Sequence, residues 1–92
     1  EAFIMVGGAH PVLRQKLNEA LTRAGFQVKR PRVGLGGKNP RNICNRGSAG
    51  AGVQLEVSEA LRRELRIQNR LLDRFTEAVR GVLLGTNREP ET

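Results

Sequence analysis

The hydrophobic pattern of residues 1–28 predicts a strand, a helix and a second strand, in that order. Residues 2–7 form an apolar run that ends in two glycines, which is typical of a buried strand followed by a tight turn. Residues 26–28 have the pattern of a short strand. Between them, Pro11 suits the first turn of a helix and Gly25 its end, with apolar residues spaced three or four apart: Val12, Leu13, Leu17, Ala20, Leu21 and Ala24. Such a unit with short connections is normally parallel and right-handed.

The second half of the chain predicts a long loop, one strand and two helices. Residues 31–51 are rich in Gly, Pro and Asn and show no sustained periodicity; a loop of this length in a compact domain is often functional. Residues 53–57 alternate apolar and polar side chains, as a half-buried strand does. We expect Ser58 to cap a helix that is marked by Leu61 and Leu65. A further helical pattern stops at Gly85 and runs through Leu71, Leu72, Phe75, Ala78, Val79, Val82 and Leu83.

These elements predict the α/β class, with residues 1–85 in a single domain and residues 86–92 as a flexible polar tail. The chain starts within a predicted strand, so we expect it to be the C-terminal part of a larger α/β domain. No stretch approaches the roughly 18–20 apolar residues of a membrane span, and no signal-peptide pattern is visible. We therefore expect no membrane partner, and a cytoplasmic location is compatible with the single cysteine.

The net charge of +7 is concentrated in the middle of the chain. The segment from Ala20 to Leu55 contains no Asp or Glu, whereas elsewhere nine basic residues balance nine acidic ones. This pattern favours an anionic ligand, whether nucleic acid, a polycarboxylate or an acidic membrane surface, although solvated arginines in loops would give the same count. The segment, called the basic segment below, contains seven cations: Arg23, Lys29, Arg30, Arg32, Lys38, Arg41 and Arg46.

Several familiar catalytic motifs are absent from the sequence. Gly7-Gly8 lacks both the dinucleotide-binding spacing and the Gly-Lys-Ser/Thr ending of a phosphate loop. Cys44 is the only cysteine and His10 the only histidine, so neither a disulfide nor a multi-cysteine zinc site can form within the chain. We expect His10 to face solvent or to cap the first helix, and Cys44 to be a buried or incidental thiol.

Glu56 is the strongest candidate for chemistry because it is a carboxylate on an otherwise apolar strand. Such a group is paired, faces solvent, or lies in a cleft where it serves as a general base. Asn45 and Arg46 precede it in a Gly-rich loop, and an arginine fork with a neutral amide suits recognition of a carboxylate. The alternative is a structural ion pair between Glu56 and Arg46 or Arg62.

Two blocks carry a resemblance to a known family: Asn-Ile-Cys-Asn-Arg-Gly at residues 42–47, and Gly-Val-Gln-Leu-Glu-Val-Ser at residues 52–58. With the strand and helix before them, they resemble the C-terminal half of the poly-γ-glutamate hydrolase family, often labelled phage-related replication protein. The similarity covers roughly residues 3–66. It implies the C-terminal part of a zinc carboxypeptidase-like, three-layer fold with a mostly parallel sheet, and cleavage of γ-glutamyl amide bonds in an anionic polymer.

The resemblance also implies roles for individual residues. Glu56 matches the glutamate that acts as general base, Asn45 and Arg46 match positions near the substrate carboxylate, and Arg62 is expected to orient Glu56 or to bind substrate. The zinc ligands implied by the family belong to sequence before residue 1, so this chain alone is expected neither to hold zinc nor to catalyse the reaction. A phage-encoded, released protein is an alternative to the cytoplasmic location.

Two other functions stay open. A small nucleic-acid-binding module would use Arg30, Arg32, Lys38 and Arg41 on phosphates, and its binding would fall steeply with salt. A non-catalytic assembly piece would pair the edge of its first strand with a missing N-terminal segment or with another chain.

Overall fold

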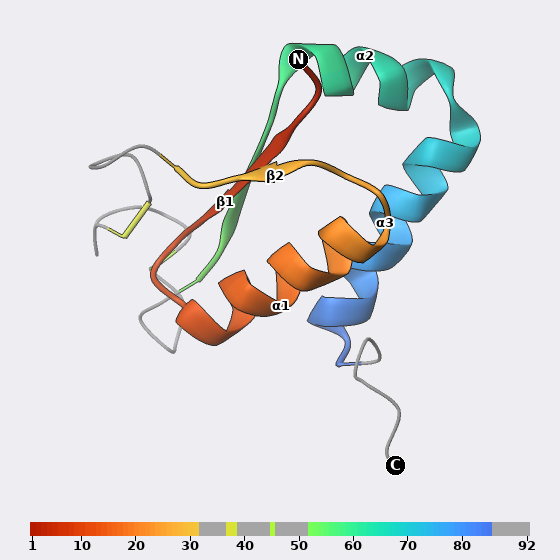
Figure 1. The fold of residues 1–92 in the computed structure, drawn as a ribbon. Helices are drawn as coiled ribbons and strands as arrows, with labels where there is room; N and C mark the ends of the chain where they lie inside the picture. Colours follow the sequence, from red (N-terminus) through yellow and green to blue (C-terminus); the bar gives the residue numbers. More distant parts are fainter. Residues whose placement is uncertain (32–36, 39–44, 46–51, 86–92) are drawn as a thin grey trace.

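The structure, a computed structural model, describes residues 1–31, 37–38, 45 and 52–85. Figure 1 shows the strands of the sheet beside the helices. The longest described helix has 15 residues, and no described helix is long and apolar enough to cross a membrane. The elements in chain order are β1 (Ile4–Gly7), α1 (Pro11–Arg23), β2 (Val28–Lys29), β3 (Gln54–Val57), α2 (Glu59–Ile67) and α3 (Asn69–Leu83).

The strands form one mixed sheet in the order β2-β1-β3. The pair β1–β2 is parallel, as predicted, with Ile4 opposite Val28. The pair β1–β3 is antiparallel, so the expectation of a mostly parallel sheet is wrong for the described strands. The reason is where β3 begins: the His10 N–H donates to the Gly52 carbonyl at 3.0 Å, so the chain enters β3 beside the end of β1 and must run back along it.

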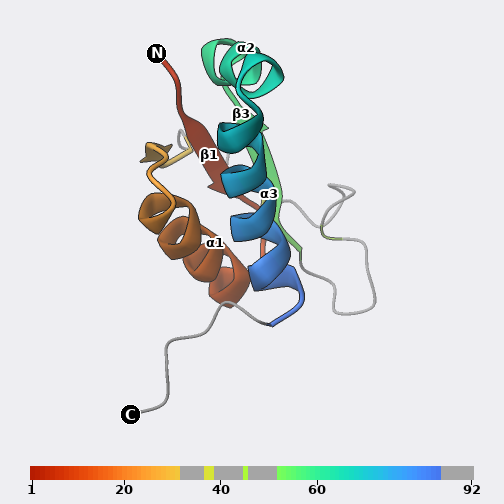
Figure 2. The ribbon, with the colours of Figure 1, turned by 90° about the vertical axis from the view of Figure 1, so that its right-hand side faces the viewer.

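The helices contribute to a single core on one face of the sheet. Ile4 and Val6 point to this face and are 0% and 3% exposed. Figure 2 shows α1 and α3 side by side over the strands, and the Phe26 and Phe75 rings meet edge to face at 5.8 Å. The described residues therefore form two layers, and the third layer implied by the resemblance stays a prediction. The buried hydrophobic core comprises Ile4, Val6, Leu17, Ala20, Leu21, Phe26, Leu61, Leu65 and Val82.

The second strand is shorter than predicted and starts later. It covers only Val28 and Lys29 because Phe26 takes part in the turn that follows the C-terminus of α1. Gly25 adopts a left-handed conformation with φ of 96°, and the Phe26 N–H donates to the Leu21 carbonyl at 3.0 Å. This turn directs the Phe26 ring into the core, so the aromatic residue ends a helix instead of opening a strand.

The predicted helix caps agree with the structure. Ser58 Oγ accepts the Leu61 N–H at 3.2 Å and so caps α2. His10 caps α1, where its Nδ1 accepts the Leu13 N–H at 3.1 Å. Of the two roles expected for His10, facing solvent or capping the helix, the capping role is therefore the observed one.

Candidate active site

Glu56 lies on the face of the sheet opposite the core. In the antiparallel pair it stands across from Met5, and directly opposed residues share a face. Leu55 and Val57 alternate with it and pack against the core instead. Glu56 is exposed, so its carboxylate stands on the sheet face that the described helices leave uncovered.

No ion pair or hydrogen bond to the Glu56 carboxylate occurs within the described part of the chain. The ion pairs found there join Lys29 to Glu1, and Arg63 to Glu59 at 2.8 Å. The alternative of a structural pair between Glu56 and Arg62 is therefore not realised, while Arg46 lies outside the described residues. Of the three settings considered for this carboxylate, the solvent-facing one is observed among the described residues.

A cation and an aromatic ring occupy the same sheet face as Glu56. Lys29 is opposite Met5 in the parallel pair β1–β2, and Glu56 is opposite Met5 in the antiparallel pair β1–β3. The three residues therefore form one row across the sheet, about 10 Å from end to end. The Lys29 ammonium lies 4.5 Å from the centre of the Phe3 ring. Its hydrogen bond to the Glu1 carboxylate lowers the pKa of that group below its usual value.

Asn45 is the buried polar residue of the described core, with 2% of its surface exposed. Its Oδ1 accepts the N–H groups of Ala9 and Gly52, both at 2.9 Å, and its Nδ2 donates to the Gly37 carbonyl. The side chain thus links the β1–α1 turn, the start of β3 and a point between β2 and β3. The sequence did not predict this role, since the partners are backbone groups up to 36 residues away.

The turn after β1 fits closely against the residues that precede β3. Gly8 has φ of 106°, and a Cβ atom at this position would lie 2.2 Å from the Gly52 carbonyl oxygen. Only glycine tolerates both the conformation and the contact. Together with the His10–Gly52 hydrogen bond, this contact fixes where β3 begins.

The other predicted site residues are dispersed. Arg62 is exposed on α2 and makes no described ion pair, so it is not brought onto Glu56 by a direct contact. Arg30 and Lys38, two of the proposed phosphate-binding cations, are exposed. The remaining predicted positions lie outside the described residues: Arg32, Arg41, Cys44 and Arg46.

The described residues do not fit a zinc ion. No group of three or more His, Cys, Asp or Glu side chains close enough to share a metal occurs among them. His10 already uses Nδ1 as a helix cap. Any zinc chemistry therefore requires ligands other than the described residues.

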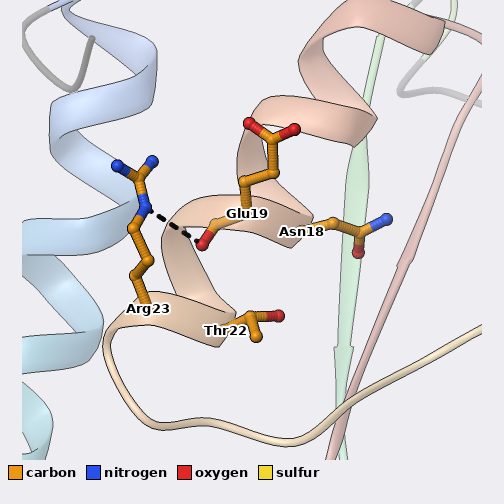
Figure 3. A pocket seen from close by; sticks show the side chains of 4 residues that line it. All are labelled: Asn18, Glu19, Thr22 and Arg23. Atoms are coloured by element: carbon orange, nitrogen blue, oxygen red, sulfur yellow. Dashed lines mark hydrogen bonds between the residues drawn. The ribbon is translucent and has the colours of Figure 1, made fainter. Parts of the chain in front are cut away.

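A surface pocket on α1 lies apart from these groups. Figure 3 shows its lining on the exposed side of the helix, where the Arg23 Nε–H donates to the Glu19 carbonyl at 3.4 Å. The described residues that line it are Asn18, Glu19, Thr22 and Arg23, of which the sequence singled out only Arg23, as a cation of the basic segment. Because both charged side chains come from one exposed helical turn, the pocket is ordinary helix surface.

Comparison with solved structures places the fold among hydrolases. The chain matches a structure described as bacteriophage poly-gamma-glutamate hydrolase with a TM-score of 0.82 and 27% identity, over 92% of this chain and 46% of that one. It matches YNDL in an apo, zinc-free form with a TM-score of 0.80 and 28% identity, over 96% of this chain and 50% of that one. The chain thus spans about half of each solved structure.

The sequence comparisons identify the family. The profile of the poly-gamma-glutamate hydrolase family matches residues 1–80, so the chain belongs to that family. It is also 38% identical over 63 residues to the SPbeta prophage-derived protein YoqZ of Bacillus subtilis (strain 168), covering 66% of this chain and 23% of YoqZ. The resemblance seen in the two sequence blocks is thereby confirmed.

Proposed function

We propose that this chain supplies the general-base glutamate of an enzyme that cleaves γ-glutamyl amide bonds in poly-γ-glutamate. The observation that carries the proposal is the exposed Glu56 carboxylate, which has no described partner, in a chain that belongs to the poly-gamma-glutamate hydrolase family. The alternative of a structural ion pair is not realised among the described residues. A carboxylate without a partner is suited to exchange protons with a substrate.

In the proposed reaction Glu56 takes a proton from a water molecule as the water oxygen attacks the amide carbonyl carbon. The carboxyl group then gives that proton to the leaving nitrogen, so the C–N bond breaks and the carboxylate is restored. The products are a γ-carboxylate and an amine. Because the same group accepts and returns the proton, no other acid from this chain is required.

Substrate binding is proposed for cations of the basic segment and for Arg62. Each residue of poly-γ-glutamate carries one carboxylate, and Arg46 and Arg62 are proposed to bind such groups through their planar forks. Lys29 shares the sheet face of Glu56, and Lys38 is exposed next to Gly37, so both add positive charge. The family membership favours this polymer over nucleic acid, which stays an untested alternative.

Zinc is proposed as the cofactor because one matched structure is described as a zinc-free form. When bound, zinc would polarise the scissile carbonyl and the attacking water. The described residues do not assemble ligands for it, so the proposal gives this chain no part in holding the metal.

The experiment is a replacement of the matched segment of bacteriophage poly-gamma-glutamate hydrolase by this chain, because their folds agree with a TM-score of 0.82. Shortening of poly-γ-glutamate is followed by size-exclusion chromatography. The hybrid is expected to cleave the polymer, and Glu56→Gln is expected to lower its turnover at least about a hundredfold, since general-base catalysis typically contributes that much or more.

The matched control is Glu59→Gln, which removes an equally exposed carboxylate three residues away that pairs with Arg63. It is expected to change turnover less than about twofold, because exposed i, i+4 ion pairs contribute little. A folded hybrid whose turnover survives Glu56→Gln would contradict the catalytic assignment. A folded hybrid without turnover, beside an active bacteriophage enzyme, would contradict the proposed function as a whole.

A further inference from the structure

The Asn45 side chain connects three segments that are far apart in sequence. Ala9 precedes it by 36 residues, Gly37 precedes it by eight and Gly52 follows it by seven. The amide is 2% exposed, and a buried amide is costly to leave without its hydrogen bonds. The three backbone groups must therefore keep their positions around it for the side chain to stay buried.

Both backbone polar groups of Gly52 are hydrogen-bonded. Its N–H donates to Asn45 Oδ1, and its carbonyl accepts the His10 N–H at 3.0 Å. Gly8 packs against the same carbonyl, so the backbone has little room to shift along the strand direction. These contacts set the point at which β3 starts beside the end of β1.

The start of β3 decides which face receives Glu56. Gln54 is opposite Gly7, and Glu56, which follows Gly52 by four residues, is opposite Met5. A slip of one residue would turn every side chain of β3 to the other face and place Glu56 against the core. The position of Gly52 therefore controls the exposure of the carboxylate.

Gly37 provides a second connection to the same sheet face. A Cβ atom on Gly37 would lie 2.7 Å from Cδ of Gln54, so the Gly37 backbone packs on the Gln54 side chain. Gln54 and Glu56 are two residues apart on one strand and so share a face. Asn45 Nδ2 donates to the Gly37 carbonyl and thus holds this segment beside the Glu56 face.

We propose that Asn45 is a positioning residue that fixes the register of β3 and thereby the placement of Glu56, and that it does not contact substrate. This inference rests on the proposed role of Glu56. It replaces the substrate contact expected for Asn45, because the buried oxygen already accepts two backbone N–H groups, which is the capacity of an amide oxygen.

The test begins with amide hydrogen exchange and cross-strand contacts, measured by NMR on the full 92-residue chain. In the unsubstituted chain the Ala9 and Gly52 amides are expected to exchange as slowly as those of β1. Asn45→Ala should accelerate both at least about tenfold and weaken the contact between Met5 and Glu56. Asn45→Asp keeps the oxygen that accepts from Ala9 and Gly52 but loses the donor to Gly37, so these two amides should exchange more slowly than in Asn45→Ala.

Gly85→Ala is the control for a loss of stability alone. Gly85 follows the end of α3 and has φ of 70°, so the substitution places alanine in a left-handed conformation. The new Cβ would meet nothing within 4 Å. It should lower the melting temperature and leave the Met5–Glu56 contact unchanged. A change in that contact specific to Asn45→Ala separates positioning from a general structural role.

Kinetics of the hybrid enzyme provide the second measurement. A positioning role predicts that Asn45→Ala lowers kcat about a hundredfold with little change in KM, as expected when a catalytic group is misplaced by about 1 Å. A raised KM with unchanged kcat would show a substrate contact and overturn the inference.

Exchange data alone can also overturn the inference. If Ala9 and Gly52 exchange as fast as exposed amides in the unsubstituted chain, or if Asn45→Ala keeps their protection and the strand register, Asn45 does not position β3. Should Asn45→Ala fail to fold, the unsubstituted chain and Asn45→Asp decide. A hybrid without turnover would count against the proposed function, while the exchange measurements would still judge Asn45.

Discussion

At the scale of single residues, the absence of a side chain at Gly8 allows two distant segments of the chain to pack closely together. Gly8 ends the turn after β1 in a left-handed conformation and touches the backbone that leads into β3. The sequence predicted a tight turn at Gly7-Gly8 but gave no indication of the segment against which it packs. That contact depends on a partner 44 positions along the chain, which no local pattern encodes.

Gly8→Ala is expected to destabilise the chain strongly. The new Cβ would lie 2.2 Å from the Gly52 oxygen and 2.6 Å from Val53 Cα, so backbone must move. The strained φ alone costs about 1–3 kcal/mol, and the clash adds to it. The measurement is the free energy of unfolding in urea.

Gly85→Ala provides the matched comparison, since it has the strained φ without the clash. We expect Gly8→Ala to exceed it by at least about 1 kcal/mol. Equal losses for the two variants would show that the turn and the start of β3 are not in contact.

Ser58 joins three elements at the opposite end of β3, and at this scale the sequence was more informative. The predicted cap of α2 is present, and its Oγ also accepts the Phe3 N–H at 2.9 Å. The Ser58 N–H donates to the Phe3 carbonyl at 3.0 Å. A local capping rule found the first bond, whereas the bonds to Phe3 follow only from the antiparallel register of β1 and β3.

Ser58→Ala is therefore expected to cost more than an ordinary N-cap, about 2 kcal/mol where about 1 is typical, because Phe3 also loses its acceptor. Thermal unfolding followed by circular dichroism measures the loss. Ser58→Thr keeps the hydroxyl and should stay close to the unsubstituted chain. A loss shared equally by both variants would mean that the hydroxyl bonds are not its cause.

The elements themselves were predicted in type and order, with one shift. All three helices have apolar stripes at helical spacing, and the structure packs most of these residues into the core, whereas Val12, Leu72 and Leu83 are exposed. The second strand was placed two residues early because Phe26 has high strand propensity, whereas in the structure Phe26 lies in the turn after α1 and packs against Phe75. Tertiary contact outweighed local preference there.

For the whole molecule, the distribution of charge is the property most relevant to an anionic polymer. The net charge of +7 comes from the basic segment, and the sheet face that the described helices leave uncovered holds Glu56 in the same row as Lys29. A polymer with one carboxylate per residue would be attracted over a range set by the Debye length.

Binding of the full chain to poly-γ-glutamate is thus expected to weaken steeply between about 0.1 M and about 1 M NaCl, as the Debye length falls from about 10 Å to about 3 Å. Isothermal titration calorimetry measures this dependence. Lys38→Gln should weaken binding at low salt, whereas Lys16→Gln, an equally exposed change outside the basic segment, should not. Salt-independent binding, or equal effects of the two variants, would argue against attraction by this segment.

The sequence alone determined the α/β class, the helices, their caps and the identity of Glu56 as the residue to explain, because helix and strand periodicity, capping and family blocks are all local in the chain. Only the tertiary structure decided the direction of β3, the face that carries Glu56 and the role of Asn45. The physical reason is that these depend on hydrogen bonds and contacts among Ala9, Gly37, Asn45 and Gly52, which the fold brings together. The same glutamate would face the core if β3 started one residue later.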